Sequence, residues 1–221
     1  MHFVWHDIQH GLFHFDSGIL YTAKQLFTRP GHAIREFIEG KRVRYFKPVS
    51  FVVILATLYG LLYHNYHLSS VYEVNIAGEG EVKDVVEKIN EWIGAHYSWA
   101  TLLTLPFYTT GSFLAFKKQE YNFTEHLVLN TFLAGQRIIL HIVAFPLVYH
   151  YTGSPSFETA RGILGFLDFI LLGWGYIQFF NKLPKIKAIL LTVLSFFIFI
   201  LTVLTASILT TMIIIKIVAR T

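Results

Sequence analysis

Residues 29–48 read RPGHAIREFIEGKRVRYFKP, and the chain turns apolar directly after them, with VSFVVILATLYGLLY over residues 49–63. Pro30 suits the first turn of a helix, because its missing N–H has no helical partner to lose there. Three apolar side chains then share one face of that helix: Ile34, Phe37 and Ile38. This pattern predicts a basic amphipathic helix at a membrane surface, followed by a first membrane-spanning helix that begins near Pro48.

The composition places the whole chain in a membrane. Hydrophobic residues make up 54% of the 221 residues and charged residues 14%, with a mean hydropathy of +0.50. A soluble domain carries about 25% charged residues, so this chain has more apolar surface than one water-soluble core buries. Helices satisfy their own backbone hydrogen bonds in hydrocarbon, so we expect an all-α protein.

The charged and sulfur-containing residues exclude several classes of function. The chain has no cysteine, which excludes disulfides and thiolate metal sites. Its net charge is +4, and the basic residues lie at the edges of apolar segments, as expected beside anionic lipid headgroups. No polar domain gathers these charges in the way that nucleic-acid binding requires, so we expect lipid and no nucleic acid as partner.

The apolar segments predict a polytopic transmembrane helical bundle of about five spans, each long enough to cross about 30 Å of hydrocarbon. The expected spans are about 49–66, 98–116, 127–149, 162–180 and 188–215. Residues 1–47 form an amphipathic region on the cytosolic face, and residues 48–221 form the bundle. Residues 67–96 carry acidic residues and an apolar face at helical spacing, which indicates an amphipathic helix at the outer surface. Just before that helix, residues 71–76 are rich in strand-forming residues and could form a short strand without an evident partner.

Positive charge predicts the orientation. Seven Lys and Arg residues precede the first span, and the next connection holds only Lys83 and Lys88. This alternation puts the N-terminus in the cytoplasm and the C-terminus outside. The basic C-terminus, with Lys216 and Arg220, argues the other way and leaves four spans with a re-entrant segment as the alternative.

Polar residues inside the spans define a candidate intramembrane site. Arg137 lies near the middle of the third apolar segment, where a charge costs about 2.5–3.5 kcal/mol. Asp168 is the one acidic residue well inside another span, so we expect an Arg137–Asp168 contact, either as a structural ion pair or as part of a substrate or proton pathway. The full candidate set is Asn130, Gln136, Arg137, His141 and Asp168.

Two further sets of residues are candidates for binding. The basic residues around the first helix are expected to contact anionic lipid or a cytosolic partner: Arg29, Arg35, Lys41, Arg42, Arg44 and Lys47. Four histidines recur every four residues near the N-terminus: His2, His6, His10 and His14. Imidazoles at this spacing can chelate a metal such as Zn²⁺, although a histidine stripe at a membrane interface gives the same pattern. No other cofactor is expected.

Two stretches resemble a known family. The first is Arg29-Pro30-Gly31 with Gly40-Lys41-Arg42, Tyr45 and Pro48, and the second runs from Pro106 through Lys117-Lys118 and Tyr121 to Glu125-His126-Leu127. Together, over residues 6–137, they resemble an uncharacterised family of bacterial integral membrane proteins, frequent in Bacteroidota and described as a domain of unknown function. Many members carry a cysteine-paired zinc ribbon ahead of the membrane part, which this cysteine-free chain lacks. The resemblance implies a multi-pass inner-membrane protein and supplies no activity.

Three functions remain open from the sequence. The first is a small transport or permeation component, which would need a homo-oligomer to build a sizeable pathway. The second is a non-enzymatic membrane scaffold or regulator, in which the buried charges only hold helices together. The third is a membrane-embedded metalloenzyme that acts on lipid through the histidine stripe. A non-enzymatic role is the main expectation.

Overall fold

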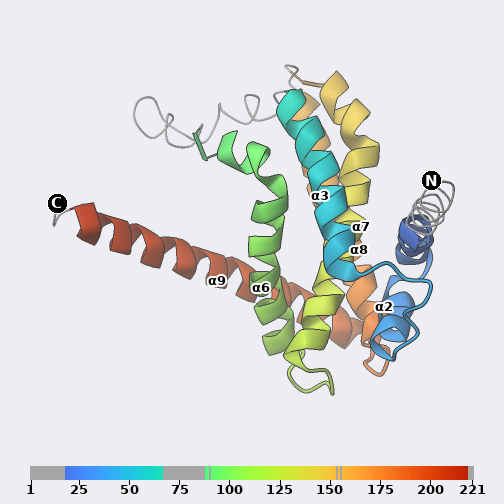
Figure 1. Cartoon of the computed structure of the whole chain (residues 1–221). Helices are drawn as coiled ribbons and strands as arrows, with labels where there is room; N and C mark the ends of the chain where they lie inside the picture. The colour runs from blue at the N-terminus through green and yellow to red at the C-terminus, as the bar shows by residue number, and fades with distance from the viewer. Residues whose placement is uncertain (1–17, 67–87, 90, 153, 155, 219–221) are drawn as a thin grey trace, which may run out of the picture.

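The computed structural model describes residues 18–66, 88–89, 91–152, 154 and 156–218. Within these residues the secondary structure is helical and no strand occurs, so the all-α fold predicted from the sequence is confirmed (Figure 1). The possible strand over 71–76 and the greater part of the amphipathic segment 67–96 lie outside the described residues. Residues 91–95, at the end of that segment, are helical.

The main helices occur where the apolar segments predicted them. Their bounds are α2 Pro30–Ile38, α3 Pro48–Asn65, α6 Tyr97–Ala115, α7 Phe123–His150, α8 Ser156–Phe179 and α9 Lys185–Val218. A further helical stretch over residues 18–28 precedes α2. Both α2 and α3 begin with a proline in their first turn, as the sequence predicted.

Four helices are long and apolar enough to cross a membrane: α3, α7, α8 and residues Lys185–Thr210 of α9. The second predicted span is a helix of 19 residues, α6, but it does not belong to this group. Its many hydroxyl side chains, four of them threonines, lower its hydropathy. Instead α6 packs against α9, α7 and α3.

The helices α3, α6, α7 and α8 run between two distinct ends (Figure 1). One end holds residues 29–47, 116–122 and 180–187, and we call it the basic end. Its exposed basic residues are Lys41, Arg42, Arg44, Lys47, Lys117, Lys118, Lys182, Lys185 and Lys187. The opposite end, which we call the far end, holds the junction between α7 and α8, and carries Arg161 near the start of α8. The connections that the sequence predicted on one side of a membrane therefore lie together.

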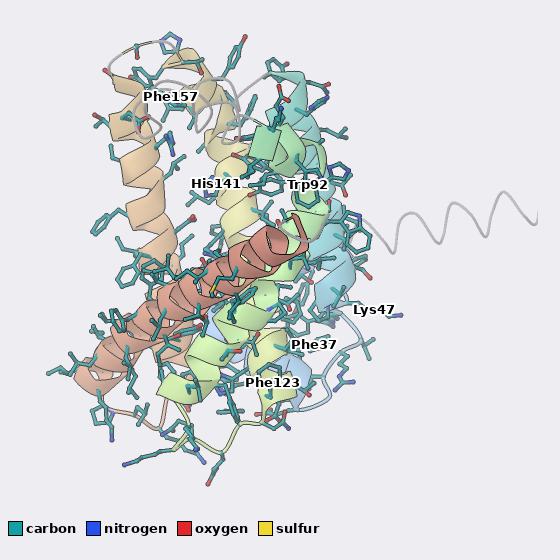
Figure 2. The ribbon with its side chains drawn as sticks, turned by 90° about the vertical axis from the view of Figure 1, so that its left-hand side faces the viewer. Phe37, Lys47, Trp92, Phe123, His141 and Phe157 are labelled. Carbon is teal, nitrogen blue, oxygen red and sulfur yellow. The ribbon has the colours of Figure 1, made fainter. Side chains whose placement is uncertain are left out.

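The core is aromatic and lies between α2, α3, α7 and α8. Its fully buried members include Phe51 of α3, Phe132 of α7, and Tyr176 and Phe179 of α8. By contrast, α8 and α9 carry many exposed large apolar side chains (Figure 2). Soluble monomers rarely expose apolar patches of this extent, which agrees with helices that face lipid.

The last helix departs from the bundle. It begins at the basic end, packs against α6 and α8, and its C-terminal half projects away from the other helices (Figure 1). Gly111 of α6 permits the close contact with α9, because a Cβ built there would lie 2.5 Å from the backbone oxygen of Ser195. The helix α9 is therefore held mainly through its N-terminal half.

Candidate functional site

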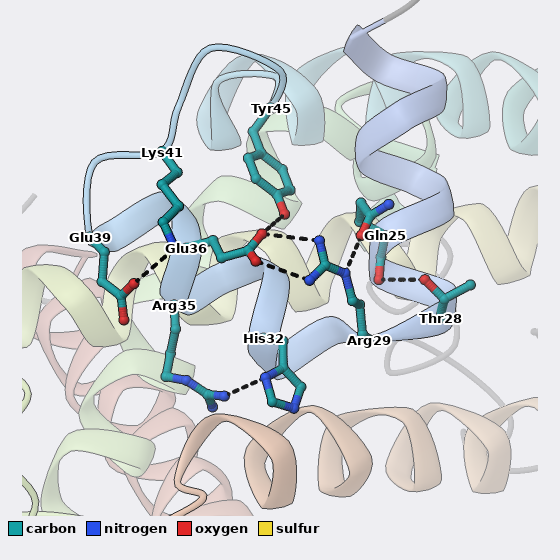
Figure 3. Close-up of polar contacts among 9 residues, drawn as sticks. All are labelled: Gln25, Thr28, Arg29, His32, Arg35, Glu36, Glu39, Lys41 and Tyr45. Carbon is teal, nitrogen blue, oxygen red and sulfur yellow. Dashed lines mark hydrogen bonds and ion pairs between the residues drawn. The ribbon is translucent and has the colours of Figure 1, made fainter.

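The basic segment of residues 29–48 is built around the carboxylate of Glu36 (Figure 3). The Arg29 guanidinium donates two hydrogen bonds to it, at 3.0 and 3.1 Å, and the Tyr45 hydroxyl donates a third at 2.7 Å. Arg29 also donates to the side chain of Gln25 in the preceding helix. These contacts fix α2 against the helix before it and the loop after it. Gly40, with a φ of +98°, makes the turn that returns this loop.

A second set of contacts docks α2 onto the end of α8. Arg35 donates hydrogen bonds to the backbone oxygens of Gln178 and Phe179, the latter at 2.8 Å, and its guanidinium lies 2.7 Å from His32 Nδ1. Carbonyls at a helix C-terminus lack helical partners and attract a positive charge. Gly31 lets the two backbones approach, because a Cβ there would lie 2.2 Å from the amide nitrogen of Phe179.

These contacts change how the predicted lipid-binding residues are interpreted. Arg29 and Arg35 are half-buried and form hydrogen bonds within the protein. Arg42 donates a hydrogen bond of 3.1 Å to the backbone oxygen of Phe37. Lys41 lies 3.7 Å from a Glu39 oxygen, in an exposed pair of little energetic weight. Arg44 and Lys47 are exposed as well, and no ion pair is found for either within the described part of the chain. Contact of this segment with lipid or a partner remains a prediction and depends on Lys41, Arg44 and Lys47.

The network around Glu36 predicts an acid-sensitive contact. The Tyr45 hydrogen bond, together with Arg29, lowers the pKa of Glu36 in the folded protein. An unfolded glutamate has a pKa of about 4.3, so the unfolded state binds the proton first as the pH falls. The stabilisation is therefore complete above that value and is lost as the pH falls through the lower, folded pKa. We expect thermal stability in detergent to drop between about pH 5 and 3, with a shallower drop for Glu36→Gln. If the melting temperature fell equally steeply with pH in the unaltered chain and in Glu36→Gln, Glu36 would not be the source of the acid sensitivity.

The charge in the third apolar segment has an aromatic partner. Arg137 of α7 donates a hydrogen bond of 3.1 Å to the Tyr108 hydroxyl of α6, and its guanidinium lies 4.7 Å from the centre of the Tyr108 ring. The Tyr108 ring stacks in turn on Phe199 of α9, with centroids 3.8 Å apart. Cation–π contacts of this kind strengthen in a site without water. The guanidinium therefore takes part in joining α7, α6 and α9.

The structure gives Asp168 a different ion-pair partner from the predicted Arg137. The Asp168 carboxylate of α8 pairs with His141, whose Nε2 lies 2.9 Å from Asp168 Oδ2. His141 lies one helical turn beyond Arg137, on the same side of α7. The imidazole of His141, and not the guanidinium of Arg137, is the group that contacts the Asp168 carboxylate. An electrostatic interaction between Arg137 and Asp168 remains. Asp168 Oδ1 and Arg137 Nε are both buried and, within the described part of the chain, have no hydrogen-bond partner.

A cavity is lined by His141 of the His141–Asp168 pair. Its volume is about 180 Å³, and it lies between α3, α7 and α8 in the half of the bundle toward the far end. Its lining includes His141, Tyr59 and Arg161, and Figure 2 shows the position of His141 along α7. The side chains of His141 and Asp168 are 25% and 22% exposed. The structure thus places a histidine–carboxylate pair beside a cavity in the far half of the bundle.

The other two members of the predicted site lie elsewhere. Asn130 donates to the Ser112 hydroxyl at 2.8 Å and accepts a hydrogen bond of 2.6 Å from the Tyr176 hydroxyl. His126 Nδ1 lies 3.0 Å from the same Ser112 oxygen. This fully buried network joins α6, α7 and α8. Gln136 donates to the backbone oxygen of Leu26 at 2.8 Å and ties α7 to the helical residues 18–28.

Several residues of these sites were not predicted from the sequence: Tyr59, Tyr108, Ser112, His126, Arg161 and Tyr176. Hydroxyl and phenol groups are common in apolar segments, and nothing in one segment indicates which of them meets a charge on another. The charge of Arg137 did require a partner near the same depth, and an aromatic hydroxyl on a neighbouring helix meets that requirement.

The predicted metal site cannot be placed. His2, His6, His10 and His14 lie outside the described residues, so metal binding by this stripe remains a prediction. Among the residues that the structure does describe, no three His, Asp or Glu side chains gather in an arrangement that would hold a metal ion.

One comparison with known proteins gives a match. Residues 16–60 match a family described as a protein of unknown function (DUF3667). The predicted resemblance to a domain of unknown function is thereby confirmed over this range. No curated protein and no solved structure matches the chain. The matched range contains the Glu36 network, α2 and most of α3.

Proposed function

We propose that this chain is a small transport or permeation component of a bacterial inner membrane, and that the His141–Asp168 pair is its proton-binding site. The observation that carries the proposal is the cavity of about 180 Å³ that is lined by His141 of this pair, between helices able to span a membrane. An ion pair that served packing alone would need no such cavity beside it.

The chemistry of the pair suits reversible protonation. Histidine is the side chain whose ordinary pKa lies nearest to physiological pH, and ionisable residues at membrane depth mark ion and proton pathways. The pair would therefore take up and release a proton at the imidazole, while the carboxylate orients the ring.

The distribution of charge supports an orientation. Lys and Arg are retained on the cytoplasmic side of membrane proteins, so the basic end faces the cytoplasm in this proposal. The cavity then opens toward the outside, and the pair has access from that side. A second copy of the chain would complete a route to the cytoplasm.

Proton flux into lipid vesicles tests the proposal. We expect purified protein in vesicles with an internal pH-sensitive dye to carry protons faster than empty vesicles, and Asp168→Asn to return the flux to the level of empty vesicles. The control is Glu120→Gln, which removes a carboxylate of an exposed pair with Lys182 at the basic end and should leave the flux unchanged. Flux from the Asp168→Asn protein equal to that of the unaltered chain would refute the assignment.

The second candidate, a membrane scaffold, is favoured by the buried network of Ser112, His126, Asn130 and Tyr176, whose contacts fix the helices. Thiol labelling separates the two functions in this cysteine-free chain. Leu164 lines the cavity and Leu133 is buried. Labelling of Leu164→Cys by a membrane-impermeant reagent, with Leu133→Cys protected, supports transport, whereas protection of both supports a scaffold.

A further inference from the structure

A second cavity lies at the basic end, where α6 ends and α9 begins. Its volume is about 370 Å³. Three lysines line it, Lys117 and Lys118 from the end of α6 and Lys187 from the first turn of α9, together with the apolar side chains of Leu114 and Leu191. All three lysines are exposed. The cavity therefore joins a cationic rim to an apolar wall.

The positive charge in this cavity is not neutralised by the protein. Within the described part of the chain, none of the three lysines has an ion pair, and no carboxylate lines the cavity. Glu120, two residues after Lys118, is paired with Lys182 at 2.7 Å. Three like charges around one opening repel one another, and a bound anion would relieve that repulsion.

The position of the apolar wall indicates which anion fits. Leu114 lies in α6 and Leu191 in α9, each about one helical turn farther from the basic end than the lysines. Beside them α9 exposes further large apolar residues, Ile186 and Leu190. A soluble phosphate would bind the lysines and leave the apolar surface of the two leucines uncovered. A phospholipid would place its phosphate at the lysines and an acyl chain along the leucines.

We propose that this cavity is a specific binding site for a phospholipid headgroup that carries two phosphates, held by Lys117, Lys118 and Lys187. Basic pockets between helix ends on the cytoplasmic side are suited to such headgroups. The three positive charges exceed the single charge of an ordinary anionic phospholipid. The site differs from the residues around α2, which contact lipid, if at all, as an exposed surface. It does not depend on transport through the His141–Asp168 cavity.

Lipid retention by the full chain tests this site. The protein is placed in nanodiscs of phosphatidylcholine that contain cardiolipin, a lipid with two phosphates, and bound lipid is counted by native mass spectrometry after release. We expect retention of cardiolipin to fall by about tenfold or more in the double variant Lys118→Gln/Lys187→Gln. The matched control, Lys24→Gln/Lys185→Gln, removes the same charge from two exposed lysines that do not line the cavity and should change retention by less than about twofold.

Three outcomes would overturn the proposal. Equal losses in both double variants would mean a general attraction of the basic end for anionic lipid. Equal retention of phosphatidylglycerol at matched total charge would remove the preference for two phosphates. Displacement of the lipid by millimolar inorganic pyrophosphate would assign the lysines to a soluble anion.

A variant that keeps the charge controls for folding. A Lys118→Arg/Lys187→Arg protein that retains the lipid would show that the loss in the glutamine variant is not a loss of folding.

Discussion

Gly31→Ala is expected to detach α2 from the end of α8. The added Cβ would lie 2.2 Å from the amide nitrogen of Phe179 and 2.4 Å from the carbonyl carbon of Gln178. Both atoms belong to the backbone, so no change of side-chain rotamer relieves the overlap. Overpacking of a tight contact costs about 1–3 kcal/mol, and separation of the helices would also remove the Arg35 hydrogen bonds. We expect a lower melting temperature in detergent and faster protease cleavage within residues 39–47.

The control for this substitution is Gly162→Ala in α8. No atom lies within 4 Å of a Cβ built at Gly162, and alanine is favoured over glycine inside a helix by about 0.5–1 kcal/mol. We expect this variant to be as stable as the unaltered chain or slightly more so. If Gly31→Ala also had unchanged stability and cleavage, the close docking of α2 on α8 would be disproved.

Gly111→Ala is expected to loosen α9 from the bundle. Its Cβ would lie 2.5 Å from the Ser195 backbone oxygen and 3.2 Å from the Phe199 amide nitrogen, both on α9. Close backbone contact of this kind is a main source of helix association where lipid surrounds both helices. The cost is about 1–3 kcal/mol, and the stacking of Tyr108 on Phe199 would be disturbed along with it.

A buried position on α9 reports this loosening. The Ser195 side chain is 3% exposed, so a single cysteine introduced there should resist thiol reagents in detergent. We expect rapid labelling of that cysteine when Gly111→Ala is added. Gly173→Ala is the matched control, because its Cβ would meet α9 at an ordinary 3.9 Å from the Thr192 methyl group. Labelling at the same rate in both backgrounds would show that Gly111 does not hold α9.

The sequence predicted the helices better than their partners. Apolar length located every main helix, and the prolines at 30 and 48 marked two helix starts. The helix α7 begins earlier than its apolar segment, because Asn122 and Glu125 form a capping box with hydrogen bonds of 2.9 and 2.7 Å. Signals of this local kind are readable without a structure.

The contacts between helices could not be predicted as well from the sequence. Arg137 and Asp168 were paired because each is the conspicuous charge of its segment, but pairing depends on the rotation of each helix, which a single sequence does not give. The rotation found here brings His141 to Asp168 and Arg137 to Tyr108. Likewise, the basic residues near α2 indicated a membrane surface, whereas Arg35 caps a helix 143 residues away.

That separation has a consequence for biosynthesis. Arg35 and Gly31 meet residues 178 and 179, which leave the ribosome long after α2. At about 5–20 residues per second, roughly 7–30 s pass between the synthesis of the two partners. During this interval the Arg35 guanidinium and the Gly31 backbone have no α8 to bind, so docking of α2 is a late step that follows insertion of the helices between them.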